Sequence, residues 1–203
     1  MEKMQITAKK LDTFFRILQI CISIALIASV VGLGIIGSYF LFDLSPEMIG
    51  TGYGSVEIGF LELEIAESVV LSHDVIILGA AAELALGFLC MLTGRSCVKC
   101  VRNILAPMAD GSPFRGVVSE TLSKLARLSC ALGIKMNLME LIGEILTTQA
   151  YDLTGLLLSE NIVHVTMNYT FDLGFLVVAA AFLLLSFVFH YGEELQQLSD
   201  ETL

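Results

Sequence analysis

Four long apolar runs restrict what this chain can fold into more than any other feature of its sequence. They cover residues 17–42, 75–94, 128–150 and 173–189. A helix of about 20 apolar residues crosses the roughly 30 Å hydrocarbon core of a bilayer. The first run has 26 residues without a charge, whereas the last has 17, near the lower limit for a crossing. The runs predict an all-α membrane protein with four transmembrane helices.

The eleven Lys and Arg residues indicate which ends of these helices face the cytoplasm. All of them lie within residues 1–16 or 95–135. Basic residues that flank apolar runs collect on the cytoplasmic side of a membrane. The connections 43–74 and 151–172 contain no Lys or Arg and together hold ten carboxylates. We therefore expect both termini and the connection 95–127 to be cytoplasmic, and the two acidic connections to lie outside.

Residues 1–203 are interpreted as one four-span membrane domain, with a cytoplasmic tail over 190–203. A signal peptide is the alternative for the first run, because Lys9, Lys10 and Arg16 precede it. However, 26 apolar residues are too many for the apolar region of a signal peptide, and no A-x-A-like cleavage site follows them. We expect an uncleaved first span.

Both outer connections alternate apolar and polar residues, which is the pattern of β-strands. In residues 56–65 the alternation slips by one residue at Phe60-Leu61, as a β-bulge would produce. In residues 163–171 the alternation is continuous. An amphipathic strand left alone would present an unpaired edge. We therefore expect Val56–Ile65 and Val163–Phe171 to pair in a small extracytoplasmic antiparallel β-sheet that caps the helices.

The cytoplasmic connection has helical patterns of its own. Cys97–Leu105 is predicted to form a short amphipathic helix that ends before Pro107. The next helix is predicted to begin near Pro113, because proline is well tolerated in the first turn of a helix. From Arg115 the pattern continues without a breaker into the third apolar run. That helix should project into the cytoplasm.

Three carboxylates inside the apolar runs give the strongest functional signal. An ionised side chain at the centre of a bilayer costs on the order of 3 kcal/mol on translocon scales, so such residues find partners, face the interior of the protein or stay protonated. Asn137, Glu140 and Glu144 lie on one face of the third run, and Glu83 and Glu140 reach similar depths from the outer side. These four residues are predicted to form an intramembrane polar site. It either binds an ion or a proton, or it is a polar seam that orients helices.

Two short motifs match known binding sites in spacing, but their surroundings in the sequence do not support binding. Gly32 to Gly37 matches the glycine pattern of dinucleotide-binding proteins, but it lies inside a predicted span rather than between a strand and a helix. We interpret it as small residues that allow close helix packing, for which residues 80–82 and Gly87 could supply the matching surface. Cys97 and Cys100 have the spacing of half a zinc site, but a structural zinc needs four ligands.

The sequence also lacks the patterns of several classes of function. No basic stripe with interleaved aromatic residues supports nucleic-acid binding. No constellation of histidine, acid and nucleophile appears in the sequence. We expect no catalytic residue, no cofactor, no bound metal and no enzymatic activity. The five cysteines are expected to stay reduced, because all of them map to the cytoplasmic half of the predicted topology.

The end of the chain resembles the closing motif of a bacterial membrane family. The residues that carry the resemblance are Phe189-His190-Tyr191-Gly192-Glu193-Glu194-Leu195-Gln196-Gln197-Leu198-Ser199-Asp200-Glu201-Thr202-Leu203. This stretch is similar to the family catalogued as domain of unknown function 2975. Gly111-Ser112-Pro113-Phe114, preceded by Arg102-Asn103-Ile104-Leu105, resembles a second landmark of that family. His190 stands where the family has a basic residue, usually Arg.

The resemblance implies a multi-pass protein of the bacterial cytoplasmic membrane without an established activity, so no functional residue is carried over. We expect a non-enzymatic sensing or partner-docking module in the lipid bilayer, with a second copy of the chain or another membrane protein as its partner. The alternative is a small ion- or proton-binding carrier component that uses the intramembrane carboxylates.

Overall fold

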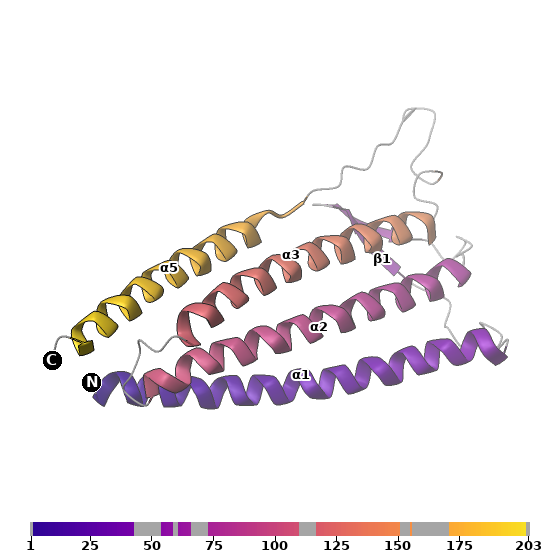
Figure 1. Ribbon diagram of the computed structural model, residues 1–203. Coiled ribbons are helices and arrows are strands. Elements are labelled where there is room, and N and C mark those ends of the chain that lie inside the picture. Colours follow the sequence, from indigo (N-terminus) through magenta and orange to yellow (C-terminus); the bar gives the residue numbers. More distant parts are fainter. Residues whose placement is uncertain are drawn as a thin grey trace. The chain divides into compact units, whose positions relative to one another are not determined.

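Long helices form most of the part of the chain that the computed structural model describes, which is residues 2–42, 54–58, 61–65, 73–109, 117–150, 155 and 171–201 (Figure 1). They are α1 (Glu2–Phe42), α2 (His73–Ala109), α3 (Val117–Ala150) and α5 (Gly174–Glu201). Three of them, α1, α2 and α5, are long and apolar enough to cross a membrane. This agrees with a membrane protein.

The structure corrects the expectation of a fourth transmembrane helix. The predicted span 128–150 lies within α3, and α3 is not among the helices apolar enough to cross a membrane. Lys135, Glu140 and Glu144 interrupt its apolar half, and three further charged residues lie in its first three turns. Charged side chains carry a high cost in hydrocarbon, so composition separates α3 from the other three helices. The prediction of four transmembrane helices is wrong on this criterion.

The predicted β-sheet cap is also wrong. The described strands are β1 (Gly54–Ile58) and β2 (Leu61–Ile65), and they form an antiparallel hairpin in which Ile58 pairs with Leu61. The slip that we interpreted as a bulge separates two paired strands, because the residues before it and after it belong to β1 and β2 and Ile58 lies opposite Leu61. In the described part of the chain no strand of the later connection joins this hairpin, and residues 163–170 lie outside that part.

The helices extend well beyond the apolar runs. α1 begins at Glu2, and α5 continues to Glu201, through most of the predicted tail. α2 continues without a break to Ala109, so Cys97–Leu105 is part of α2 and not a separate helix. Pro107 lies in the last turn of α2, where its missing N–H removes one backbone hydrogen bond, and the helix ends two residues later.

The chain divides into two compact units, each made of segments that are distant in sequence. Unit 1 comprises Met1–Ala28, Phe88–Asn137 and Phe171–Leu203, and unit 2 comprises Ser29–Gly87 and Leu138–Thr170. α1, α2 and α3 each contribute residues to both units. The prediction of a single domain stays a prediction.

Unit 1 is built from antiparallel neighbours. The N-terminal part of α1 meets the C-terminal end of α2 through Asp12 and Arg102. The start of α3 meets the end of α5 through a hydrogen bond between Ser119 and Glu193. At the other end of the unit, Gly133 of α3 lies against an aromatic ring near the start of α5. Figure 1 shows both chain termini at the same end of this unit.

The apolar core of the described residues belongs to unit 1. α3 contributes more residues to this core than any other helix. Its four buried apolar residues follow one another at spacings of four, three and one, so they lie on one side of the helix. The buried apolar residues are Ala8, Leu26, Val98, Cys100, Leu105, Val118, Leu122, Leu125, Ala126 and Ala179. The charged half of α3 is thus the best-packed segment of the unit.

Unit 2 has close helix contacts at three glycines, which are Gly32, Gly79 and Gly143. A Cβ on Gly32 would lie 2.8 Å from Leu84 Cδ2, and one on Gly79 would lie 3.5 Å from Leu146 Cβ. By contrast, a Cβ on Gly34, Gly37 or Gly87 would have no neighbour within 4 Å among the described residues. Of the predicted glycine packing motif, only Gly32 is therefore at a close contact, and its neighbour is a leucine.

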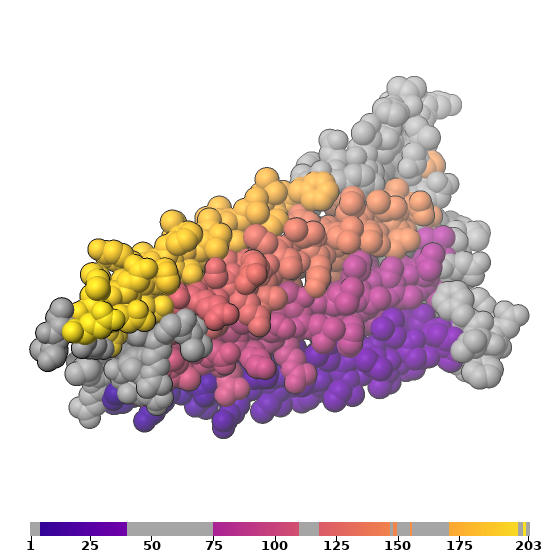
Figure 2. All heavy atoms as spheres, in the orientation of Figure 1, coloured from indigo at the N-terminus to yellow at the C-terminus, as the bar shows by residue number. Residues whose placement is uncertain are grey.

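The apolar surfaces of the three candidate spans face outward. Only 6–11% of the residues in the most apolar 18-residue stretch of each span are buried. Figure 2 shows the side chains of α5 and α1 at the surface of the face in view. Apolar surface of this extent is unusual in a water-soluble monomer and is what lipid or a membrane partner covers.

Candidate functional site

The carboxylate of Glu83 lies against α3 within unit 2. Its Oε1 atom is 3.0 Å from the position that a Cβ on Gly143 would occupy. Glu140 lies three residues before Gly143 and four before Glu144, so Glu140 neighbours both positions on the α3 surface. Any side chain larger than hydrogen at position 143 would displace the Glu83 carboxylate. Glycine therefore allows Glu83 to approach the face of α3 that bears the other two acids.

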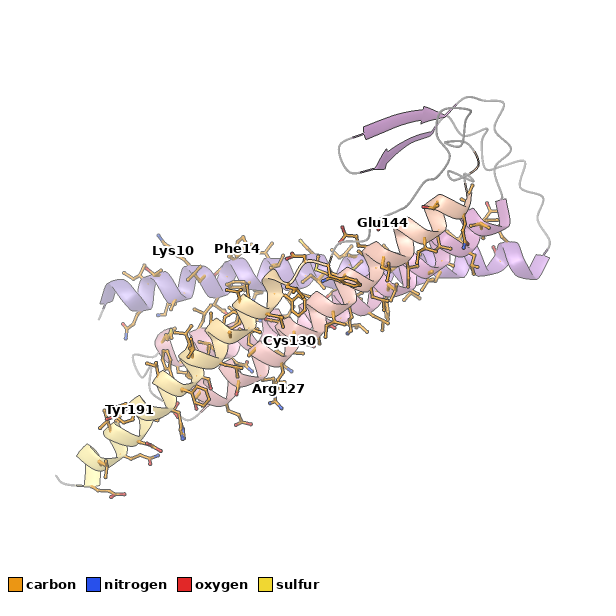
Figure 3. The ribbon with its side chains drawn as sticks, turned by 90° about the horizontal axis from the view of Figure 1, so that it is seen from above. Lys10, Phe14, Arg127, Cys130, Glu144 and Tyr191 are labelled. Carbon is orange, nitrogen blue, oxygen red and sulfur yellow. The ribbon has the colours of Figure 1, made fainter. Side chains whose placement is uncertain are left out.

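These three acids are exposed in the described chain, including Glu144 near the end of α3 (Figure 3). Exposure of acids next to an apolar surface means that water, a bound cation or a partner must solvate them once the apolar surface is covered. A single carboxylate in this setting can take up a proton, but among the described residues the three acids do not form a group that could hold a metal ion. The predicted ion site, and the alternative of a polar seam, both stay predictions.

Asn137 has a well-defined structural role in unit 1. Its side-chain Oδ1 accepts a hydrogen bond from the backbone N–H of Asp172 at 2.8 Å, and its Nδ2 donates to the Asp172 carbonyl at 3.0 Å. The same Nδ2 also donates to the Gly133 carbonyl at 2.9 Å. Asp172 in turn accepts a hydrogen bond from the N–H of Gly174 through its Oδ1 at 2.7 Å. Asn137 thus fixes the chain where α5 begins.

Lys135 also has a partner inside the protein. Its ammonium group donates a hydrogen bond to Thr93 Oγ1 on α2, and Thr93 is buried. A lysine near the end of an apolar run can otherwise extend its side chain toward the aqueous boundary. The hydrogen bond reduces the cost of placing its charge on the inner side of α3.

A polar cluster that the sequence analysis missed joins α3 to α5. Ser119 Oγ donates to Glu193 Oε2 at 3.0 Å, and Ser186 Oγ donates to the Ser119 carbonyl at 2.7 Å. Glu193 is 7% exposed, and its Oε1 has no hydrogen-bond partner among the described residues. His190 lies beside it, with Nδ1 3.8 Å from Glu193 Oε2.

A periodic signal could have revealed this cluster. The buried residues Ala179, Ser186 and Glu193 recur every seven residues, which keeps them on one side of α5. Ser and Glu in such a series indicate a polar helix contact rather than a lipid-facing surface. Composition alone assigned Glu193 to an acidic tail, and a glutamate in such a tail is usually exposed to water.

The opposite side of α5 carries an exposed apolar stripe. Leu184, Tyr191 and Leu198 also recur every seven residues and are 66%, 63% and 60% exposed. They begin five residues after Ala179, which is about 140° around the helix from the buried series. Leu195, at 50% exposure, lies on the same side. Figure 3 marks Tyr191 in the last part of α5. We call Leu184, Tyr191, Leu195 and Leu198 the α5 stripe.

The Cys97 and Cys100 pair lies on α2, and all five cysteines are free. Among the described residues no group of three His, Cys, Asp or Glu side chains is arranged to hold a metal ion. Cys100 is part of the apolar core, which is a common place for an unreactive cysteine. The pair therefore contributes to packing in unit 1.

Comparison with family models, with curated proteins and with solved structures finds no match to this chain. The resemblance to the family of unknown function 2975 therefore stays a prediction from two short motifs.

Proposed function

We propose that this protein is a non-enzymatic membrane module that docks a partner through the α5 stripe. The observation that carries the proposal is the continuation of the exposed stripe past the apolar run. A crossing of about 20 residues that begins at Leu173 ends near Gly192. A crossing of that length would leave Leu195 and Leu198, both of them exposed, beyond the lipid tails. An apolar surface in water favours a protein partner.

The chemistry of the stripe favours a basic, amphipathic helix as the partner. Residues at spacings of four and three form the face that a second helix reads. The carboxylates of Glu194 and Glu201 lie beside that face, and residues 173–203 contain no Lys or Arg. Glu194 is exposed, with its Oε1 3.5 Å from His190 Nε2. Apolar anchors flanked by Lys or Arg would complement both features.

Replacing Leu195 with glutamine should weaken recovery of this partner about tenfold. Burying a leucine side chain contributes about 1.5 kcal/mol or more, and about 1.4 kcal/mol corresponds to a factor of ten. The measurement is quantitative mass spectrometry after affinity purification in a mild detergent. Gln196→Ala is the matched control, because Gln196 is exposed on another side of α5. Its recovery should equal that of the unchanged protein.

A photo-crosslinking amino acid at Tyr191 identifies what touches the stripe in cells. The proposal expects a cross-linked peptide that combines apolar residues with Lys or Arg. Cross-links to lipid alone, or equal recovery by the Leu195→Gln and Gln196→Ala variants, would contradict it. A peptide from a second copy of this chain would identify self-association in place of a separate partner.

The proposed location is a bacterial cytoplasmic membrane with both termini in the cytoplasm. The confinement of cations to residues 1–16 and 95–135 supports the orientation. The contact between Ser119 and Glu193 supports placing the end of α5 on the same side as the start of α3. Single cysteines at Ser45 and Ser159, on a cysteine-free background, should react with an impermeant thiol reagent in intact cells, and one at Ser112 should not. Reaction at Ser112 alone would reverse the orientation.

A second candidate is an ion- or proton-binding carrier component. It is favoured by one contact, the approach of the Glu83 carboxylate to Gly143 on the face that carries Glu140 and Glu144. Carboxylates on facing helices repel each other when they come close and all are ionised, and a shared proton or cation would relieve that repulsion. Such a ligand, bound only by the folded protein, would raise the melting temperature.

The carrier candidate predicts a melting temperature that depends on pH, or on Na⁺, K⁺, Mg²⁺ or Ca²⁺. Circular dichroism from about pH 5 to about pH 8 would measure this dependence. Glu83→Gln and Glu140→Gln should each abolish it while leaving the protein folded. Glu120→Gln is the control, since Glu120 lies on α3 outside the apolar run. A melting curve indifferent to pH and to all four cations would reject the candidate.

A further inference from the structure

A cavity of about 570 Å³ lies between α1 and α2 in unit 1. Its polar lining comes from the N-terminal part of α1 and the C-terminal end of α2. The residues that matter for its chemistry are Lys9, Asp12, Gln19, Lys99, Arg102 and Asn103. Three of these are cations and one is a carboxylate, so the lining has a net positive charge. The cavity is large enough for a phosphate group and part of its substituent.

Arg102 is held in a fixed orientation inside the cavity. Its Nε donates to Asp12 Oδ1 at 2.8 Å, and its Nη1 donates to Gln19 Oε1, also at 2.8 Å. These bonds use two of the five N–H donors of a guanidinium. The other donors make no hydrogen bond within the described chain. A planar guanidinium whose orientation is already set loses little freedom when it binds a phosphate in the two-pronged geometry that arginine favours.

The cavity lies at the depth of lipid headgroups. Gln19 is the third residue of the apolar run that starts at Ile17, and Lys99 follows Gly94, the end of the second run, by five residues. Five helical residues span about 7.5 Å, which is about the thickness of one polar headgroup layer. Lysine and arginine side chains at this depth face the phosphates of a bilayer.

An apolar surface continues from the cavity along α1. Thr13 lines the cavity, and Ile20 and Ile27 follow it at successive spacings of seven residues, on the same side of the helix. Ile20 is 56% exposed and Ile27 is 66% exposed. A ligand with an anionic head and long apolar chains can therefore contact the basic lining and the isoleucines together. A soluble phosphate would use only the lining.

We propose that this cavity binds the phosphate of an anionic phospholipid, with the acyl chains of the lipid lying along Ile20 and Ile27. Basic pockets between membrane helices are suited to such headgroups. Lys9 and Lys99 supply charge, Arg102 supplies directed hydrogen bonds, and Asn103 adds a neutral polar group. The site is independent of the α5 stripe and needs no docked partner.

The test uses the purified full-length protein in a mild non-ionic detergent at constant ionic strength. Phosphatidylglycerol, phosphatidylcholine and inorganic phosphate are added in separate arms. Native mass spectrometry measures retained lipid, and circular dichroism measures the melting temperature. Phosphatidylglycerol should be retained and should raise the melting temperature. Phosphatidylcholine and inorganic phosphate should do neither, since the first has no net charge and the second has no acyl chains.

Two neighbouring lysines of α1 provide the matched variants. Lys9 lines the cavity and Lys10 does not, and Figure 3 shows Lys10 on the outer side of α1. Lys9→Gln and Lys99→Gln should each weaken retention of phosphatidylglycerol about fivefold, as expected for one basic residue at an anionic lipid surface. Lys10→Gln should retain the lipid like the unchanged protein.

Three results would overturn the proposal. Equal weakening by Lys9→Gln and Lys10→Gln would mean diffuse attraction to a basic surface and no defined site. Equal retention of phosphatidylcholine would mean that the apolar face alone binds lipid. An equal rise in melting temperature with inorganic phosphate would assign the cavity to a soluble anion.

Discussion

The Gly133→Ala variant should unfold about 4–8 °C below the unchanged protein. A Cβ at position 133 would overlap Cβ, Cγ and Cδ1 of Phe175. The Cβ atom of Phe175 cannot swing aside by rotation of its ring, so α3 and α5 must move apart. Overpacking of this kind costs about 2 kcal/mol, and Gly133 is buried, which leaves little room for relaxation. Thermal unfolding followed by circular dichroism measures the effect.

Gly94→Ala is the matched control for this prediction. Gly94 lies on α2 in the same unit, and a Cβ there would meet no atom within 4 Å in the described part of the chain. Alanine is a better helix former than glycine by about 1 kcal/mol, so this variant should be neutral or slightly more stable. Combining Gly133→Ala with Phe175→Ala should recover part of the loss. Equal melting of the two alanine variants would show that α3 and α5 do not meet at Gly133.

The Asn137→Leu variant should be destabilised by about 2 kcal/mol, because it removes three hydrogen bonds and leaves backbone groups of Asp172 without partners. Leucine has the same branched arrangement of four side-chain heavy atoms as asparagine, so the change mainly tests polarity. The loss of stability should also be visible locally, at the start of α5. Hydrogen exchange at the N–H of Asp172, measured on peptides that cover the start of α5, should become faster.

The specificity of that result can be checked with Gln149→Leu. This change also replaces an amide side chain on α3 with leucine, at a residue that is exposed. It should neither lower the melting temperature nor change exchange at Asp172. Asn137→Asp gives a further comparison, since a carboxylate can accept from the Asp172 N–H but cannot donate to either carbonyl. Unchanged exchange at Asp172 in Asn137→Leu would refute the proposed anchoring role.

Gly133 and Asn137 lie one helical turn apart, and together they position the first turn of α5. Gly133 allows Phe175 to approach α3, and Asn137 pairs with the backbone just before the helix. At the far end of the same contact, Ser119 bonds to Glu193. The inner side of α5 is therefore fixed at both ends. This leaves its outer side, with the α5 stripe, in a defined orientation for a partner.

The glycine and asparagine contacts illustrate why part of this protein could be predicted from its sequence and part could not. The three apolar helices were predictable because length and apolar composition are local properties of the chain, and α1, α2 and α5 were placed by them. For α3 the number of apolar residues led to a wrong prediction of a membrane span. Lys135, Glu140 and Glu144 raise the cost of placing this helix in a bilayer more than the neighbouring leucines lower it.

The β-hairpin shows the same limit at shorter range. Alternation identified residues 56–65 as strand-forming, but a bulge within one strand and a boundary between two strands produce the same slip in the pattern. The pairing of Ile58 with Leu61 joins two strands that are neighbours in sequence. The predicted sheet instead paired this segment with a strand about 100 residues later in the chain. Closing a short loop costs less chain entropy than closing a long one, so the local hairpin has the advantage.

The sequence by itself determined the apolar helices, the sorting of charges and the presence of acids within apolar runs, because each depends on residues adjacent in the chain. Only the tertiary structure decided which side chains meet. Asn137 pairs with a backbone 35 residues away, and Ser119 with a carboxylate 74 residues away. Arg102 reaches Asp12 across 90 residues to form the wall of a basic cavity. Helix periodicity assigns each residue to a face, but the neighbour of that face depends on the packing of all the helices.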